Sequence, residues 1–371
     1  MARGQVGQGN SVSHGKARPR YRCKTCGKTF SADAGTMFEG LRKPAELIVI
    51  VVTRLSYECP VQAIVHAFGL DERTVADWRD RAGAQCQRVH EGIVEQGNLD
   101  LMHVQADEIR VKGCKLMAWM GLAMMVSTRL WLAGVVQGSR DRGLADRLMS
   151  QVRRCAACLR PLLVLTDGWS AYPGSIRRAF REKVKPTAGV GRACLQVWPQ
   201  LHIGTVIKRT EKKRVVEVTR KIAHGPVEEA EKLLHSSRGG MVLNTAFIER
   251  LNGTFRERLA SLTRKSRHAA RQIFALEMGM YLVGCSYNFW FPHHELSKPS
   301  HVGSPCTPAM AAGLTDHVWS IYELLSYQIA PPLWVPPKKR GRPKKQSASV
   351  PTRGNRPRVR FHKGVLCLAT G

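Results

Sequence analysis

Acidic residues are scarce in this chain. Its 371 residues include 28 Asp and Glu but 58 Lys and Arg, which gives a formal net charge of +30. Such an excess of positive charge indicates a polyanionic partner. For a chain of this size we expect nucleic acid, with an anionic membrane surface as the alternative.

Long uninterrupted apolar runs are missing as well. Residues 1–20 are Gly-rich and basic, with no apolar segment typical of a signal peptide, and are expected to be a flexible arm. The longest apolar stretch, 116–136, contains Ser127, Thr128 and Arg129 near its middle. These residues are costly at a bilayer centre but suit a turn between two buried strands. We therefore expect no membrane span and a cytoplasmic, nucleoid-associated protein.

A second cysteine pair is absent near the N-terminus. The eleven cysteines, without export signals, indicate a reducing cytosol and mostly free, buried thiols. Cys23 and Cys26 have the CxxC spacing of a zinc knuckle, so 21–40 is predicted to be a partial zinc ribbon. Upstream of Cys23 only His14 offers a further ligand, and a metal-free hairpin is the alternative.

Residues 44–90 are predicted to form a helix-turn-helix domain. The turn Gly69-Leu70-Asp71 separates two helices, and Asp71 can cap the second one. Val75 and Trp78 are expected to pack inward. The outward residues, which are candidates for contact with the DNA major groove, are Arg73, Thr74, Asp77 and Arg79. The alternative is an ordinary helical hairpin with a solvated charged face.

From about residue 98 to 290 the pattern changes to strands and helices. Strands are expected at 103–111, 115–126, 129–136 and 160–169, with helices at 142–156 and 173–183. A three-stranded meander, a helix and a fourth strand is the order of a ribonuclease-H-like core, an α/β fold with a mixed sheet. In that fold the first and fourth strands are neighbours. Residues 185–240 are interpreted as a basic insertion.

Three acids stand in these segments. Asp107 lies in the first strand, Asp167 ends the fourth, and Glu249 lies on a later helix. Carboxylates on two strands and a facing helix can hold two divalent cations, because Mg²⁺ or Mn²⁺ prefers oxygen ligands. Glu108 is adjacent to Asp107 but should point to the opposite face of the sheet, so we choose Asp107. The acids expected to be only caps or surface charges are Asp100, Asp141 and Asp146.

The helix of Glu249 presents a polar face. Glu249, Asn252 and Arg256 are spaced i, i+3 and i+7 and therefore share one side. A carboxylate, an amide and a guanidinium can contact a metal ion, a base or ribose, and a phosphate respectively. Glu257 is expected on the solvent or DNA side.

The C-terminal stretch carries another DNA signal. No acidic residue follows Glu323, and 331–371 is predicted to be a disordered basic tail. Arg340-Gly341-Arg342 resembles the core of an AT-hook, in which a glycine between two arginines lets the backbone lie deep in a narrow minor groove. Non-specific binding to phosphates is the alternative.

The segments 104–112, 162–172 and 245–267 resemble the three catalytic blocks of DDE transposases from small bacterial insertion sequences, which carry an N-terminal zinc ribbon and a helix-turn-helix. Residues 307–325, within a C-terminal extension at 291–330, are similar to the tail of such enzymes. The likeness runs from about Tyr21 to Leu325, and departs from the family in having one cysteine pair instead of two.

The resemblance implies Mg²⁺-dependent DNA strand cleavage and transfer at the ends of the element. Asp107, Asp167 and Glu249 would be the metal ligands, supported by Asn252 and Arg256. The expected partners are double-stranded DNA, as element ends and target, and further copies of the chain. The alternative is a non-catalytic DNA-binding protein, a decayed or domesticated derivative.

Overall fold

The computed structural model describes residues 11–14, 20–23, 29–112, 117–185, 192–212, 214–262, 272–299, 301, 303–329, 360–362 and 365–367. Arg3–Ala330 forms one compact unit, and the first two residues with Pro331–Gly371 form the other. In the second unit the structure describes strands β12 (Arg360–His362) and β13 (Val365–Cys367), an antiparallel hairpin. The tail predicted to lack structure therefore contains a short hairpin.

A six-stranded mixed sheet forms the centre of the larger unit. In sheet order its strands are β11 (Arg214–His224), β10 (Leu201–Glu211), β7 (Leu162–Asp167), β4 (Met102–Lys112), β5 (Met117–Met125) and β6 (Trp131–Gln137). β4, β7 and β10 run parallel, while β5, β6 and β11 are antiparallel to their neighbours. The predicted α/β class is confirmed, and so is the pairing of the first and fourth core strands.

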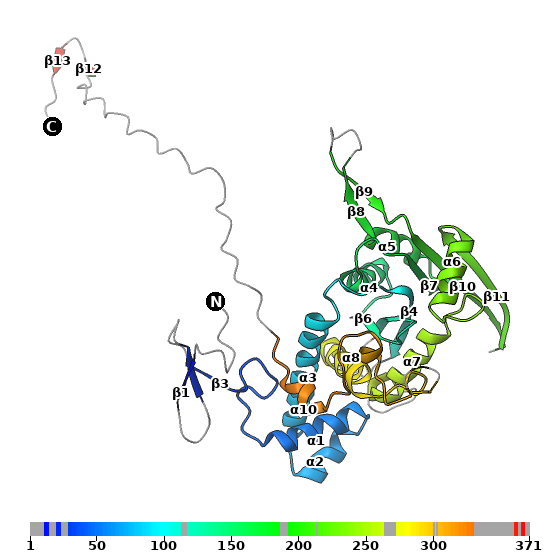
Figure 1. The fold of residues 1–371 in the computed structure, drawn as a ribbon. Helices are drawn as coiled ribbons and strands as arrows, with labels where there is room; N and C mark the ends of the chain where they lie inside the picture. Colours follow the sequence, from blue (N-terminus) through cyan, green and yellow to red (C-terminus); the bar gives the residue numbers. More distant parts are fainter. Residues whose placement is uncertain are drawn as a thin grey trace. The chain divides into compact units, whose positions relative to one another are not determined.

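Helices cover both faces of this sheet (Figure 1). α4 (Arg142–Cys155) packs on β5 and β6, and α5 (Ala171–Ala179) packs on α4. α6 (Val227–Ser236), α7 (Ala246–Arg258) and α8 (Ile273–Cys285) lie against the opposite face. Because side chains alternate along a strand, odd-numbered residues of β4 meet the α6 and α7 side, and even-numbered residues meet the α4 and α5 side.

Three helices precede the sheet: α1 (Ala45–Ser56), α2 (Val61–Phe68) and α3 (Glu72–Ile93). Gly69 ends α2 in the left-handed conformation that glycine adopts without strain, with φ of 58°. Asp71 caps α3 by accepting a hydrogen bond from the Arg73 amide at 2.8 Å, as predicted. α3 continues far beyond the turn, and its second half packs against α8.

The remaining elements join these layers. They are the 3₁₀ turn Ala260–Leu262, the π-helical turn Ser286–Trp290 after α8, α9 (Pro308–Ala311) and α10 (Ile321–Ser326). In the π-helical turn, Asn288 donates to and accepts from the backbone of Trp131 at 2.9 Å, which pairs the start of β6 with a side chain. The helices α1, α2 and α10 all contact α3.

Three expectations about local structure are wrong. The helix predicted at 173–183 ends at Ala179, because Phe180 is fully buried against Trp198 and Arg181–Val184 pairs as β8 with β9 (Cys194–Val197). The basic segment interpreted as an insertion contributes β10 and β11 to the central sheet. Part of the expected flexible arm, β1 (Ser11–His14), pairs with β2 (Arg20–Cys23), which in turn pairs with β3 (Thr29–Ser31).

Two predictions about the environment can be compared with the fold. Seven cysteines among the described residues are free, and four of them are buried. Ser127, Thr128 and Arg129 form the turn between the buried strands β5 and β6. Within the described ranges no helix has the length and apolar character needed to cross a membrane.

Candidate metal centre

The pairing of the parallel strands β4 and β7 places Asp107 beside Asp167, where β7 ends. β4 and β7 pair in register up to Ala106 and Thr166, so the next residue of each strand is an acid on the same face of the sheet. Oxygens of Asp107, Glu108 and Asp167 lie within 4.8 Å of one another. The sequence prediction that the first two acids meet is confirmed.

Glu249 faces the same space from α7. An open hollow of about 520 Å³ lies between the strand ends and this helix. It is lined by Asp107, Arg140, Asp167, Gly168, Trp169, Ser170, Val206, Ile207, Lys208, Thr245 and Glu249. Glu249 is not part of the tight group of oxygens, but its carboxylate accepts a hydrogen bond from the Thr245 hydroxyl at 2.7 Å. All three predicted acids therefore line one hollow.

Gln105 holds the start of α7 against β4. Its side-chain oxygen accepts hydrogen bonds from the amides of Phe247 and Ile248, each at 3.1 Å, and its nitrogen donates to the Asn244 carbonyl at 2.8 Å. The first amides of a helix have no partner within the helix, so this buried side chain acts as its cap. Gln105 thereby sets the position of Glu249, a role that its sequence context did not reveal.

Replacing Gln105 with leucine should lower the free energy of unfolding by about 2–3 kcal/mol, since two amides and a carbonyl lose their buried partner. Urea unfolding followed by circular dichroism measures this loss. Gln96→Leu is the matched control, because Gln96 is exposed. Equal effects of the two substitutions would show that the cap does not stabilise α7.

Asn252 and Arg256 lie on the same side of α7 as Glu249. The Asn252 amide donates to the Asp107 carboxylate at 2.8 Å, and Asn252 is 1% exposed. In this structure the buried Asn252 amide is engaged by Asp107, and its contact with a base or ribose stays a prediction. The positive charge of Arg256 lowers the pKa of Asp107. Both residues support the acid on β4, and Glu257 is exposed as expected.

Glu108 was excluded from the site on the basis of the sequence, but in the structure its carboxylate lies close to those of Asp107 and Asp167. Its side chain does leave the opposite face of β4, where its oxygens bind Arg140 and the Tyr172 hydroxyl, the latter at 2.9 Å. The side chain is only 3% exposed. Because β7 ends at Asp167 and its pairing with β4 stops one residue earlier, a carboxylate on either face of β4 can still come close to Asp167. The adjacent pair Asp107-Glu108 was the only signal for this in the sequence.

Two cationic side chains lie beside the acids. Arg140 contacts Glu108 and, at 3.3 Å, Asp167, and its guanidinium carbon lies 4.5 Å from the centroid of the Trp169 indole. Lys208 on β10 forms an ion pair with Glu249. These contacts offset part of the negative charge, and a cation bound by the carboxylates would compete with them.

The acids on β4 resist ionisation. Burial raises the pKa of Asp107 to about 6, and the negative charges of Asp167 and Glu249 also raise it. Burial raises the pKa of Glu108 to about 7, with a further rise from Asp167 and an opposing effect of Arg140. Crowded carboxylates of this kind are typical of sites that bind a divalent cation, which stabilises the charged forms.

The donor set fits a hard divalent cation. It offers carboxylate oxygens from two strands and a helix around an open hollow, and no cysteine or histidine lines it. Oxygen ligands favour Mg²⁺ or Mn²⁺ over softer metals. Asp107, Asp167 and Glu249 are the residues that would hold the metal, with Glu108 close by.

The raised pKa values predict a pH-dependent response to metal. Both acids bind protons more tightly in the folded chain than in the unfolded one. Their contribution to stability is therefore complete below about pH 4 and is lost as the pH rises through 6 to 7.

A divalent cation should bind the ionised carboxylates more tightly than the protonated ones. Millimolar Mg²⁺ should therefore raise the melting temperature by about 2–5 °C at pH 8 and by about 1 °C or less at pH 5. Differential scanning fluorimetry at matched ionic strength measures both shifts. A shift of equal size at the two pH values would contradict a site at these acids, and Asp107→Asn should abolish the difference.

The predicted DNA-contacting residues of α3 have different surroundings. Arg73 is exposed and Thr74 is half-buried, and both line a hollow of about 400 Å³ with the basic pair Arg42 and Lys43. Val75 and Trp78 are buried, as expected. DNA contact at this surface stays a prediction.

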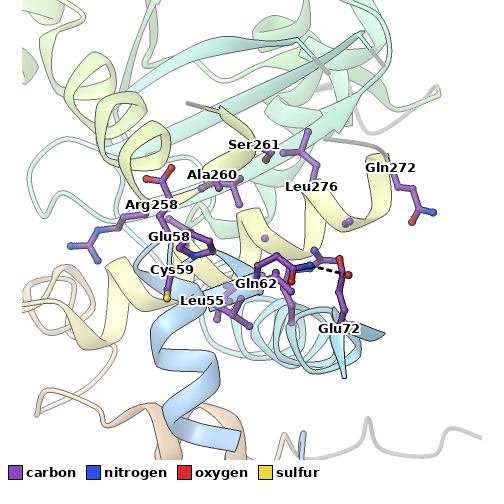
Figure 2. A pocket seen from close by; sticks show the side chains of 18 residues that line it. Leu55, Glu58, Cys59, Gln62, Glu72, Arg258, Ala260, Ser261, Gln272 and Leu276 are labelled. Carbon is purple, nitrogen blue, oxygen red and sulfur yellow. Dashed lines mark hydrogen bonds between the residues drawn. The ribbon is translucent and has the colours of Figure 1, made fainter. Parts of the chain in front are cut away.

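Arg79 belongs to another hollow. It forms an ion pair with Asp80 at 2.8 Å and lines a space of about 440 Å³ between the first helices and α7–α8. Figure 2 shows this space, where a hydrogen bond joins Gln62 to Glu72 and where Glu58 and Arg258 are both among the lining residues. Arg79 is thus less available than Arg73 to a DNA groove.

The predicted zinc ligands and the AT-hook-like residues lie outside what the structure describes. Cys23 ends β2, but its side chain is not described, and neither are Cys26 and the tail residues Arg340, Gly341 and Arg342. Zinc binding and minor-groove contact therefore stay predictions.

Two of the acids expected to be caps or surface charges have structural partners. Asp141 caps α4 by accepting a hydrogen bond from the Leu144 amide, and Asp146 forms an ion pair with Arg178 at 2.5 Å.

No protein-family model matches the chain, and a search of curated proteins found no match.

Proposed function

We propose that the chain is a DDE-type transposase that cleaves DNA strands and transfers them in a reaction that depends on Mg²⁺ or Mn²⁺. The observation that carries this proposal is the meeting of Asp107, Asp167 and Glu249 at one hollow from two parallel strands and a facing helix. The strand order β10-β7-β4-β5-β6, with a three-stranded meander followed by parallel strands, is the one expected of a ribonuclease-H-like core.

The residues around the hollow have separable tasks. Asp107, Asp167 and Glu249 supply oxygens, while Asn252 orients Asp107 through its amide. Gln105 fixes the helix that carries Glu249. When bound, divalent cations at such a site would activate the attacking hydroxyl and stabilise the departing oxygen. No covalent link between protein and DNA is then required.

The basic side chains would position the DNA. Lys208 and Arg140 border the hollow, so each could exchange its carboxylate partner for a phosphate oxygen when a strand and metal bind. Arg73 and Thr74, with Arg42 and Lys43 next to them, offer a separate contact surface for a duplex. A net charge of +30 supports a polyanionic substrate.

A second candidate function is DNA binding without catalysis. The ion pairs of Arg140 with Glu108 and Asp167, and of Lys208 with Glu249, favour it, because they balance the acids without a metal. The two functions differ in their need for a divalent cation. Binding alone needs none, whereas strand transfer does.

The test is an assay of nicking and joining on DNA that contains the sequences flanking the gene. Purified full-length chain should convert this DNA only in the presence of Mg²⁺ or Mn²⁺, and EDTA should stop the reaction. DNA binding without any cleavage or joining in either metal would support the non-catalytic alternative and overturn the proposal.

A further inference from the structure

The side of α7 that faces away from the acids carries a second, basic surface. Arg250, Thr254 and Arg258 are spaced four residues apart and share one side of the helix. At about 100° per residue this side is roughly opposite the one that bears Glu249 and Asn252. Two adjoining hollows, of about 330 and about 300 Å³, lie along it. We call them together the α7 groove; the residues that line both are Arg250, Thr254, Tyr287, His293 and Glu295.

Aromatic rings hold two of the guanidiniums in this groove, those of Arg129 and Arg258. The guanidinium carbon of Arg129 lies 4.0 Å from the centroid of the Phe247 ring. That of Arg258 lies 3.7 Å from the Phe291 ring and 4.7 Å from the Tyr57 ring. A guanidinium stacked on a ring keeps its N–H groups at the edge free to donate in a fixed plane. The arginines are therefore preorganised for a planar or tetrahedral oxyanion.

The positive charge of the groove is not balanced. Among the described residues, no ion pair joins Arg129 or Arg250 to a carboxylate. Glu295 also lines the groove, but Lys298 already binds it at 2.7 Å. Burial lowers the pKa of Arg129, and the repulsion of Arg250 lowers it further. An anion in the groove would relieve this repulsion.

Buried donors in the groove also lack acceptors. His293 Nδ1, and Arg258 Nε and Nη1, are buried with no hydrogen-bond partner among the described residues. Burial, together with the charges of Arg129 and Arg250, lowers the pKa of His293 to about 4. The ring is therefore neutral at pH 7, and one tautomer can donate from Nδ1. Unsatisfied buried donors are costly, and a ligand with several acceptor oxygens would satisfy them.

We propose that the α7 groove binds the phosphate backbone of a nucleic-acid strand. Phosphate oxygens match the guanidinium edges, the Thr254 and Tyr287 hydroxyls and the His293 ring in charge and hydrogen-bonding capacity. Arg250 and Arg258 are two helical turns, or about 12 Å, apart along α7, so the groove extends beyond one phosphate and favours a strand over free phosphate. Because the groove is on another side of α7, binding there does not depend on the proposed strand transfer.

Binding of labelled single-stranded and duplex DNA in EDTA tests this proposal, since catalysis is then excluded. Arg250→Gln is expected to weaken the affinity about tenfold and to reduce the slope of log affinity against log salt by about one. Arg160→Gln is the matched control, because Arg160 is exposed in the loop before β7 and carries the same charge. Arg250→Lys, which keeps the charge, should retain most of the affinity.

Three results would overturn the proposal. The first is an affinity of Arg250→Gln within twofold of the Arg160→Gln control. The second is a melting temperature of Arg250→Gln several degrees below wild type in the absence of DNA, because removing a repelled charge should not destabilise the fold. The third is a stabilisation of wild type by inorganic phosphate, compared with chloride at equal ionic strength, that Arg250→Gln abolishes while DNA affinity is unchanged. That last result would assign the groove to a small anion.

Discussion

Replacement of Asp167 with alanine is expected to lower the rate of Mg²⁺-dependent strand cleavage by about 10³-fold or more. Asp167 ends β7 next to Asp107 and lines the hollow that Glu249 faces. A bound metal contributes several kcal/mol of transition-state stabilisation, and about 4 kcal/mol corresponds to a factor of about 10³. The rate is measured by single-turnover nicking of end-containing DNA at saturating protein.

The same substitution should leave the fold intact. Asp167 raises the pKa of both Asp107 and Glu108, so its removal relieves the repulsion that its half-buried carboxylate exerts on these two acids. The melting temperature at pH 8 in EDTA is therefore not expected to fall. Asp100→Ala is the matched control, since Asp100 is an exposed acid at the start of β4 and should keep full activity. Equal activity of Asp167→Ala and wild type would exclude a metal site at this residue.

Comparison of two glutamates would identify the third acid. Glu249→Gln should reduce cleavage as much as Asp167→Ala, because its carboxylate lines the hollow. Glu108→Gln should have a much smaller effect, because Arg140 and Tyr172 already occupy both of its oxygens. The reverse order of effects would transfer the ligand role from Glu249 to Glu108.

Replacement of Gly83 with alanine should lower the free energy of unfolding by about 3 kcal/mol, which is large for one added methyl group. Gly83 lies in α3 where this helix crosses α8. A Cβ atom at Gly83 would lie 2.6 Å from Cβ of Met278 and closer still to the Met278 carbonyl oxygen. A backbone oxygen cannot rotate away, so the two helices would have to separate.

Gly253→Ala provides the matched control within another helix. A Cβ at Gly253 of α7 meets no atom within 4 Å, so alanine should instead stabilise the chain by up to about 1 kcal/mol through its helix propensity. Chemical denaturation of the two variants separates the effects of propensity and packing. Stabilisation by both substitutions would show that α3 and α8 are not in close contact in solution.

Several features of the candidate site could be read from local patterns. The alternation in β4 and the apolar run of β7 predicted one strand that contains Asp107 and one that ends at Asp167, and the meander order predicted that these strands are neighbours. Helical spacing placed Glu249, Asn252 and Arg256 on one side of α7. These predictions succeed because each depends on the period of a single element or on the order of adjacent elements.

Other features depend on contacts between distant residues. The helix after β7 ends early because Phe180 packs against Trp198, eighteen positions later, and this burial outweighs local helix propensity. The segment of β10 was interpreted as part of an insertion and not as a neighbour of β7, since strand pairing is not encoded in the pattern of one strand. Glu108 was excluded from the site for a similar reason. Alternation along a strand gives the face from which a side chain leaves, but not the position that its carboxylate reaches.

The sequence by itself determined the excess of positive charge, the periods of the main helices and strands, and the three acids Asp107, Asp167 and Glu249. Those properties are local, and the physical chemistry of single segments is sufficient to interpret them. The tertiary structure alone decided that Gln105 caps α7, that Arg140 joins Glu108 to Asp167, and that arginines from a β-turn and a helix gather in the α7 groove. Each of these contacts joins residues that are far apart in the chain, and only packing of the core brings them within bonding distance.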